Sequence, residues 1–318
     1  MKGLTDIAGI RVGHVSHYHA ITGCTAILCE QGAVGGVDIR GSASGTQEID
    51  TLHPLHLTNQ VHGILLAGGS AFGLEAASGV RRYLARRGVG YFFGGEHIPI
   101  VPAAILFDLG IGKSNVHPGL AMGEAAAAAA SADAVAEGCV GAGTGATVGK
   151  LLGMKQAMKS GIGSFTVALP GGVLVAALAA VNAFGDVRDP ATGKIVAGAR
   201  QSPDSREFVN TEEQMKRAAP TLGGAPHNTT LAVIATNAKL SKVEATKLAQ
   251  FAGLGMARTI YPVNTMVDGD IAFALSLGDR TADINILGVA AAEALAGAIL
   301  RAVRLAKTLG GVPGMSGV

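Results

Sequence analysis

The chain has 318 residues, of which 48% are hydrophobic and 15% are charged, and its formal net charge is +2. This composition excludes a disordered protein, and the length is sufficient to bury a large core. The small net charge, without a stripe of Lys and Arg between aromatic residues, argues against a nucleic-acid partner. Three cysteines without a CxxC pair argue against a disulfide framework or a cysteine-ligated zinc site.

No basic segment followed by an apolar segment opens the chain, and acidic residues interrupt the alanine-rich run around 125–130. We therefore expect a cytoplasmic protein with no membrane partner. Glycine accounts for 47 residues, about twice the usual share. These glycines are scattered through apolar segments, which favours tight turns and close backbone packing.

In chain order, apolar runs and helical periodicity predict an alternation of strands and helices that is not a regular βαβ repeat. A polar segment at 185–224, rich in Asp, Arg, Pro and Ser, is interpreted as a long excursion or flexible linker. Ser241 and Glu244 have the spacing of a capping box. These features favour packed helix and sheet layers over a Rossmann or TIM-barrel fold. The predicted elements are a strand at 63–67, helices at 72–86 and 122–136, strands at 164–169, 173–181 and 231–236, a helix at 242–252, a strand at 270–276 and a helix at 285–307.

Three glycine motifs fail the patterns of nucleotide-binding loops. GGSAFG at 68–73 and GAGTG at 141–145 do not have the GxGxxG spacing, and GATVGK at 145–150 does not match a P-loop. Such a loop has another use, which is to place backbone N–H groups and Lys150 near a reacting centre. The histidines at 14, 17 and 19 and at 53 and 56 lack further ligands at a recognisable spacing, so we expect neither a metal nor a cofactor.

A Ser/His/Asp arrangement is the first option for amide hydrolysis, but the chain contains no GxSxG elbow and none of its nine histidines lies in a recognisable catalytic context. A threonine nucleophile is the second option. A threonine freed by backbone cleavage carries its own base, because its new α-amino group titrates near pH 8. Such a residue should begin a strand that leads out of a cleavable loop. Thr229 and Thr230 stand where the polar segment runs directly into an apolar strand.

At this point the sequence resembles the P1 (DmpA-like) peptidase family of self-processing hydrolases. That family includes L-aminopeptidase/D-esterases, β-peptidyl aminopeptidases and nylon-oligomer hydrolases. The resemblance covers nearly the whole chain, and its motifs occur in the family's order. They are LTDIAGIRVGH at 4–14, LAGGSAFGLE at 66–75, VGAGTG at 140–145, HNTTLAVIATNA at 227–238 and MVDGDIAFAL at 266–275.

The resemblance implies that the Asn228–Thr229 bond is the autocleavage site. A single domain, 1–318, would then be processed into an N-terminal chain 1–228 and a C-terminal chain 229–318. Thr229 would be the nucleophile. Asp268 and Asp270 match the acidic pair that orients the nucleophile and its new amine, Asn182 matches the oxyanion-stabilising asparagine, and Lys150 falls where the nylon-hydrolase branch has a lysine. Phe107 stands where some relatives carry Tyr, so a hydroxyl is absent there.

For the fold, the resemblance implies a four-layer α/β/β/α sandwich, like that of N-terminal-nucleophile (Ntn) hydrolases but with a different connectivity. It also implies a homo-oligomer, often a tetramer, that acts on a small peptide or amide substrate: a short peptide, a β-peptide, an amino-acid amide or an aminohexanoate oligomer. Two alternatives remain at this stage. One is an acyltransferase of the ornithine acetyltransferase type, and the other is a non-catalytic member of the fold.

Overall fold

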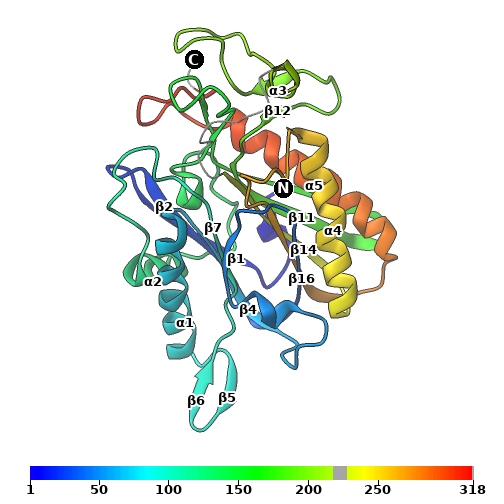
Figure 1. Cartoon of the computed structure of the whole chain (residues 1–318). Helices are drawn as coiled ribbons and strands as arrows, with labels where there is room; N and C mark the ends of the chain where they lie inside the picture. The colour runs from blue at the N-terminus through cyan, green and yellow to red at the C-terminus, as the bar shows by residue number, and fades with distance from the viewer. Residues whose placement is uncertain (218–227, 317–318) are drawn as a thin grey trace.

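Two β-sheets lie face to face between two pairs of helices in the computed structural model, which describes residues 1–217 and 228–316 (Figure 1). The long strand β2 (Thr22–Ile39) belongs to both sheets, because residues 22–28 pair with β1 and β4 whereas residues 34–39 pair with β16. The first sheet contains β10 (Ile162–Leu169), β11 (Val173–Asn182), β14 (Thr229–Ala238) and β16 (Ile271–Arg280); the second contains β1 (Arg11–His17), β4 (Val61–Ala67), β7 (Ala103–Ile105) and β3 (Gly45–Gln47).

Three apolar cores separate the four layers, and the strands supply them by alternation of side chains. On β14, Ala232 and Ile234 face the core under the helices, whereas Leu231 and Val233 face the core between the sheets. The third core joins β4 to the helices of the other side. The outer layers are α4 (Lys242–Thr259) with α5 (Ile284–Arg304), and α1 (Ala76–Arg86) with α2 (Leu120–Ala128). The predicted α/β/β/α sandwich is therefore confirmed.

The five predicted strands are present as β4, β10, β11, β14 and β16, and the capping box of α4 is formed. The helix predicted at 122–136 ends at Ala128, because Ser131 leaves it to exchange backbone hydrogen bonds with Val12 of β1. The helix predicted at 72–86 begins instead as the 3-10 turn η3 (Ser70–Glu75). Neither β1 nor β2 is predicted from the sequence. The first half of β2 is buried on both faces, so its side chains show no alternation of polar and apolar residues.

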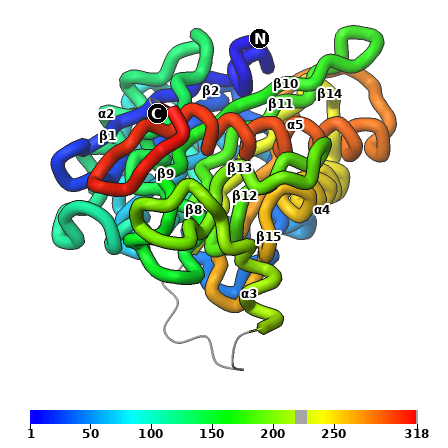
Figure 2. Tube along the Cα trace, turned by 90° about the horizontal axis from the view of Figure 1, so that it is seen from above, coloured from blue at the N-terminus to red at the C-terminus, as the bar shows by residue number. Residues whose placement is uncertain are grey.

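The interpretation of 185–224 as a flexible linker is wrong for residues 185–217; residues 218–224 lie outside the described residues. The buried carboxylate of Asp186 organises this segment. It accepts hydrogen bonds from the backbone N–H of Thr211 at 2.6 Å and of Ala199 at 2.9 Å. Around it lie β12 (Asp186–Arg188), β13 (Ile195–Ala197), β15 (Ile260–Tyr261) and α3 (Thr211–Arg217), at one end of the sandwich (Figure 2).

Within the described residues, α5 alone is long and apolar enough to cross a membrane, but 67% of that window is buried inside the protein. The helix packs against β10 and β11, so its apolar side chains form part of the hydrophobic core. Gly163 of β10 permits this contact, because a Cβ there would lie 2.0 Å from the carbonyl oxygen of Ala298. The remaining short elements are η1 (Leu4–Asp6), η2 (Ile49–Leu52), β5 (Tyr91–Phe93), β6 (Glu96–Ile98), η4 (Gly141–Gly143), β8 (Thr147–Val148), β9 (Met158–Lys159) and η5 (Pro170–Gly172).

Candidate active site

The Asn228–Thr229 peptide bond is held from both sides at the start of β14. On one side, the backbone N–H of Asn228 donates to the carbonyl of Val267 at 2.9 Å, and the Asn228 carbonyl accepts from the N–H of Gly269 at 2.7 Å. On the other side, Thr229 pairs with Asn182, the last residue of β11. Asn228 is thus held by the segment that contains Val267 and Gly269, whereas Thr229 is held by the end of β11.

The hydroxyl of Thr229 donates a hydrogen bond to the carbonyl oxygen of Asn228, the residue directly before it. The Thr229 side chain is buried, as is Asn228. A nucleophilic oxygen therefore lies against the carbonyl that it would attack if this bond is the cleavage site. The structure brings both predicted cleavage-site residues into this arrangement.

Lys150 and Asn182 are brought together beside Thr229. The Lys150 amine donates to the Asn182 side-chain oxygen at 2.7 Å and to its backbone carbonyl at 2.9 Å. The same side-chain oxygen accepts from the N–H of Thr147 at 3.0 Å, and the Asn182 Nδ2 donates to the carbonyl of Phe107 at 2.9 Å. The loop that follows the GAGTG motif thus delivers one backbone N–H and one lysine to this asparagine.

Burial lowers the pKa of Lys150 to about 7, and the nearby carboxylate of Asp268 partly opposes this shift. A substantial fraction of the amine is then neutral at physiological pH. A neutral amine has two N–H donors and one lone pair, so it can keep both bonds to Asn182 and still accept a proton. Lys150 therefore has the protonation state that a general base needs.

Asp268 and Asp270 flank Gly269, and both carboxyl groups are buried. Asp268 accepts from the N–H of Phe184 at 3.2 Å and from the N–H of Thr265 at 3.1 Å, and it also accepts from the Thr265 hydroxyl. Burial raises the pKa of Asp268, which these hydrogen bonds partly offset. The described contacts of this carboxylate fix the loop rather than Thr229 itself.

Asp270 fixes the residue after the nucleophile. Its carboxyl group accepts from the N–H of Thr230 at 2.6 Å and from the N–H of Asn264 at 2.9 Å. Burial and the neighbouring charge of Asp268 raise the pKa of Asp270 to about 7. The carboxyl group therefore anchors the start of β14, which cleavage would convert into a chain terminus.

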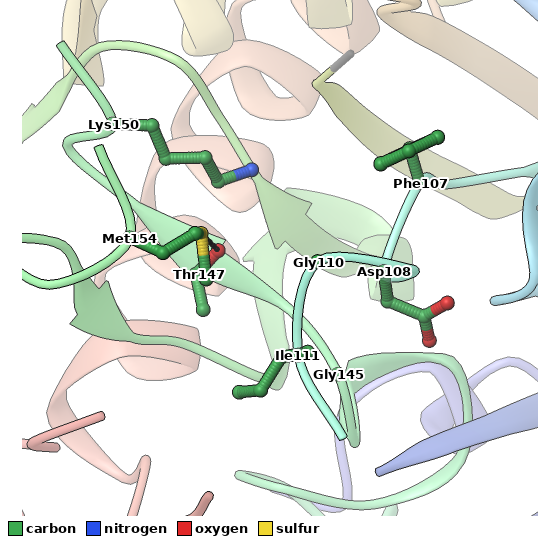
Figure 3. Close-up of a pocket in the computed structure, with 8 residues that line it drawn as sticks. All are labelled: Phe107, Asp108, Gly110, Ile111, Gly145, Thr147, Lys150 and Met154. Carbon is green, nitrogen blue, oxygen red and sulfur yellow. Dashed lines mark hydrogen bonds between the residues drawn. The ribbon is translucent and has the colours of Figure 1, made fainter. Parts of the chain in front are cut away.

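A small cavity of about 20 Å³, which has room for about one water molecule, lies beside Lys150 (Figure 3). Its walls are mainly apolar, with Met154 and Ile111 on one part and Phe107 on another. Thr147 and Lys150 line the cavity and also contact Asn182, which places it next to the nucleophile's strand. Phe107 contributes an apolar ring here, where a tyrosine would add a hydroxyl.

Two residues of this region escaped the sequence analysis. Lys159 is fully buried and donates to the carbonyls of Gly143, Ala146 and Ser160 at 3.2, 2.6 and 2.8 Å. These hydrogen bonds hold the glycine-rich loop that leads to Lys150 in place. The second residue is Gly269, whose backbone N–H donates to the Asn228 carbonyl. A lone lysine and a lone glycine give no periodic signal, so only the folded structure identifies them.

Comparison with known proteins identifies the family to which the chain belongs. The family model described as peptidase family S58 matches residues 2–316. The chain belongs to peptidase family S58. An uncharacterized aminopeptidase of Mycobacterium leprae is 38% identical to this S58 peptidase, over 100% of this chain and 94% of the relative. A 6-aminohexanoate-oligomer endohydrolase of a Kocuria species is 30% identical, over 94% of this chain and 85% of the relative.

Solved structures show the same fold for this S58 peptidase. A Burkholderia β-aminopeptidase superposes with a TM-score of 0.69 at 22% identity, over 99% of this chain and 91% of the other. The L-aminopeptidase D-Ala-esterase/amidase of Ochrobactrum anthropi, described as a new variant among the Ntn hydrolase fold, has a TM-score of 0.69 at 18% identity, over 98% and 88% of the two chains. The family and its relatives confirm a hydrolase of the Ntn aminopeptidase type.

Proposed function

We propose that this S58 peptidase cuts itself between Asn228 and Thr229, giving chains 1–228 and 229–318, and that Thr229 then hydrolyses amide bonds through an acyl-enzyme. The observation that carries the proposal is the hydrogen bond from the Thr229 hydroxyl to the Asn228 carbonyl. It holds the nucleophile against the bond that must break, as an intramolecular attack requires.

In the uncut chain Thr229 has no free α-amino group, so another base is needed. Lys150 is the proposed base, because its lowered pKa of about 7 supplies a neutral amine. Its bonds to Asn182 place that amine next to the residue that pairs with Thr229. After cleavage the α-amino group of Thr229 becomes available, and its ordinary pKa near 8 suits it to act as base on external substrates.

Asn182 is the proposed side-chain donor to the oxyanion. Among the described contacts, its Nδ2 group uses one N–H on the carbonyl of Phe107. The group carries a second N–H, which suits it to receive the negative charge of a tetrahedral intermediate. Asp268 and Asp270 act as positioning residues, since their carboxyl groups fix the backbone around the nucleophile.

The substrates are proposed to be short linear amides: amino-acid amides, small peptides, β-peptides or aminohexanoate oligomers. The narrow cavity lined by Met154, Ile111 and Phe107 favours an unbranched, mainly apolar acyl group. The similar relatives are named as an aminopeptidase and an amide-oligomer hydrolase, which favours water over an amine as the acyl acceptor. The acyltransferase alternative therefore receives no support from them.

We also propose that the enzyme works as a homo-oligomer, a tetramer by family resemblance, in the cytoplasm. The β5–β6 hairpin projects from the body of the protein (Figure 1). It carries the exposed aromatic side chains of Phe92 and Phe93. Exposed aromatic side chains of this kind are enriched at protein interfaces. Light scattering on the purified enzyme measures the number of copies, and a monomer at micromolar concentration would contradict this part of the proposal.

Denaturing mass spectrometry of the purified protein tests the processing directly. Two chains that break between residues 228 and 229 are expected, and one intact chain of 31.8 kDa would overturn the proposal. A substrate panel of L- and D-amino-acid amides, β-peptides and aminohexanoate oligomers then identifies the acyl group. Adding an amine acceptor to the same assay separates hydrolysis from acyl transfer.

A further inference from the structure

We infer that the backbone N–H of Gly269 is an oxyanion donor, first for self-cleavage and then for substrate hydrolysis. The inference rests on the proposed cleavage at Asn228–Thr229 and extends it. The Gly269 N–H already donates to the Asn228 carbonyl oxygen at 2.7 Å, and that oxygen is the atom on which negative charge develops when Thr229 attacks. A hydrogen bond to an oxygen that becomes charged strengthens during the reaction, so it accelerates the chemical step.

The donor is fixed before the reaction begins. Asn228 and Asp268 form a parallel bridge, which sets the distance between the Gly269 N–H and the carbonyl. The peptide that contains this N–H is held at its other end, because the carbonyl of Asp268 accepts from the N–H of Ala43 at 2.8 Å. The Asp268 side chain is anchored as well. A dipole held in this way needs no reorganisation as charge appears on the carbonyl oxygen.

The absence of a side chain at position 269 is required by the same geometry. A Cβ there would lie 2.8 Å from the Thr229 Oγ1 and 2.7 Å from the carbonyl oxygen of Ala43. These separations are shorter than real Cβ contacts, so any side chain would displace the nucleophile or the loop. Glycine therefore lets one backbone N–H and one hydroxyl converge on the same carbonyl group.

The covalent steps balance as follows. The Thr229 Oγ attacks the Asn228 carbonyl carbon, its proton passes to a neutral amine such as that of Lys150, and the carbonyl oxygen becomes an oxyanion held by the Gly269 N–H. The C–N bond then breaks, the nitrogen of Thr229 takes up a proton, and an ester links Asn228 to the Thr229 oxygen. One water hydrolyses this ester, which leaves a carboxylate on Asn228 and a free amine and hydroxyl on Thr229.

The same donor serves external substrates because the acyl group in both reactions is bonded to the same oxygen, Oγ1 of Thr229. Once Asn228 carries a carboxylate and withdraws, the Gly269 N–H faces the carbonyl position of the next acyl group. The oxyanion would then have two hydrogen-bond donors, the backbone N–H of Gly269 and the side-chain Nδ2 of Asn182.

The test replaces the N–H by oxygen. Glycolic acid at position 269 deletes the donor and adds no side chain. Lactic acid at position 43 is the matched control, because it deletes the bond from the Ala43 N–H to the Asp268 carbonyl in the same loop. We expect the ester at 269 to slow self-cleavage by about 100-fold or more relative to the ester at 43. Equal cleavage rates in the two esters would overturn the inference, whereas an unmodified chain that stays intact would overturn the proposed function instead.

A second measurement needs no backbone variant at the donor. Asp268–Gly269 is the only Asp-Gly pair in the sequence, so ¹³C-carbonyl aspartate with ¹⁵N-glycine labels one amide for nuclear magnetic resonance. In an uncut Thr229→Ala chain we expect strong protection of this amide from hydrogen exchange, and in the mature enzyme weaker protection, because its carbonyl partner has left. An unprotected Gly269 amide in the uncut chain, or equal protection in both forms, would contradict the role.

Discussion

Lys150 and Asn182 form a closed pair in which one amine donates to both the side-chain and the backbone oxygen of the same asparagine, at 2.7 and 2.9 Å. This pair joins the loop after the glycine motif to the end of β11, directly opposite the first residue of β14. The lysine is held without a carboxylate in hydrogen-bond contact among its described partners, so burial dominates and its pKa falls. The same hydrogen bonds therefore position both Lys150, the proposed base, and Asn182, the proposed side-chain donor to the oxyanion.

Substitution of Thr229 tests whether its hydroxyl is the nucleophile for self-cleavage and amide hydrolysis. A Thr229→Ala variant should remain a single chain and show no amidase activity, because the attacking oxygen is gone, whereas Thr229→Ser should still cleave. Denaturing mass spectrometry reads both outcomes. Thr230→Ala is the matched control, since it keeps the backbone N–H that donates to Asp270 and should be cut normally. Cleavage of the Thr229→Ala chain at 228/229 would show that another group is the nucleophile.

The pH dependence of self-cleavage should report Lys150. Since only the neutral amine accepts a proton and its pKa is about 7, the cleavage rate of freshly synthesised precursor should rise as pH increases through 7 and then level off. A Lys150→Arg variant keeps a charge at every accessible pH, so we expect a rate about 100-fold lower and no inflection near 7. Timed electrophoresis after a pH jump measures these rates. Lys155→Arg, an exposed position on the same loop, should behave like the parent, and an unchanged profile in Lys150→Arg would exclude the lysine as base.

Lys159 should contribute to stability rather than to chemistry. Lys159→Met leaves three buried carbonyls without their shared donor, which should lower the free energy of unfolding by about 3 kcal/mol. The measurement is denaturant unfolding of the uncut Thr229→Ala chain, with exposed Lys155→Met as the control. An unchanged unfolding free energy would mean that water replaces the ammonium at no cost.

The buried Lys159 should also make the free energy of unfolding depend on pH. Burial lowers the pKa of Lys159 to about 8 from an ordinary value of 10.5, so between these values the unfolded chain binds a proton that the native chain does not. Stability should therefore rise with pH across this window, by up to about 1.4 kcal/mol per pH unit for one proton. Lys159→Met should flatten this slope by that amount, which unfolding curves at pH 8 and 10 would reveal.

The cavity beside Lys150 should control acyl-group preference. Met154→Ala removes one apolar wall, so kcat/KM should shift about 10-fold toward longer acyl chains, while self-cleavage should stay intact because Met154 makes no described contact with Asn228 or Thr229. Amides of increasing chain length provide the readout. Leu152→Ala lies on the same loop outside the cavity and should leave the preference unchanged. If both variants keep the parental preference, the acyl group binds elsewhere.

The strands could be predicted because local sequence specifies them. Apolar runs gave β11, β14 and β16, and a polar segment running into an apolar strand indicated Thr229 as a candidate nucleophile, which the family motifs reinforced. The prediction failed where distant residues decide the local structure. The end of α2 depends on backbone pairing with β1, and the order in 185–217 depends on one buried carboxylate, Asp186.

The sequence by itself determined which chemical groups the enzyme carries: a threonine at the start of an apolar strand, two aspartates around a glycine, a lysine and an asparagine. The tertiary structure alone decided what these groups can do. Only packing lowers the pKa of Lys150 to about 7, raises that of Asp270 to about 7 and points the Gly269 N–H at the Asn228 carbonyl. The physical reason is that burial and hydrogen-bond direction depend on neighbours from distant parts of the chain, which no local pattern records.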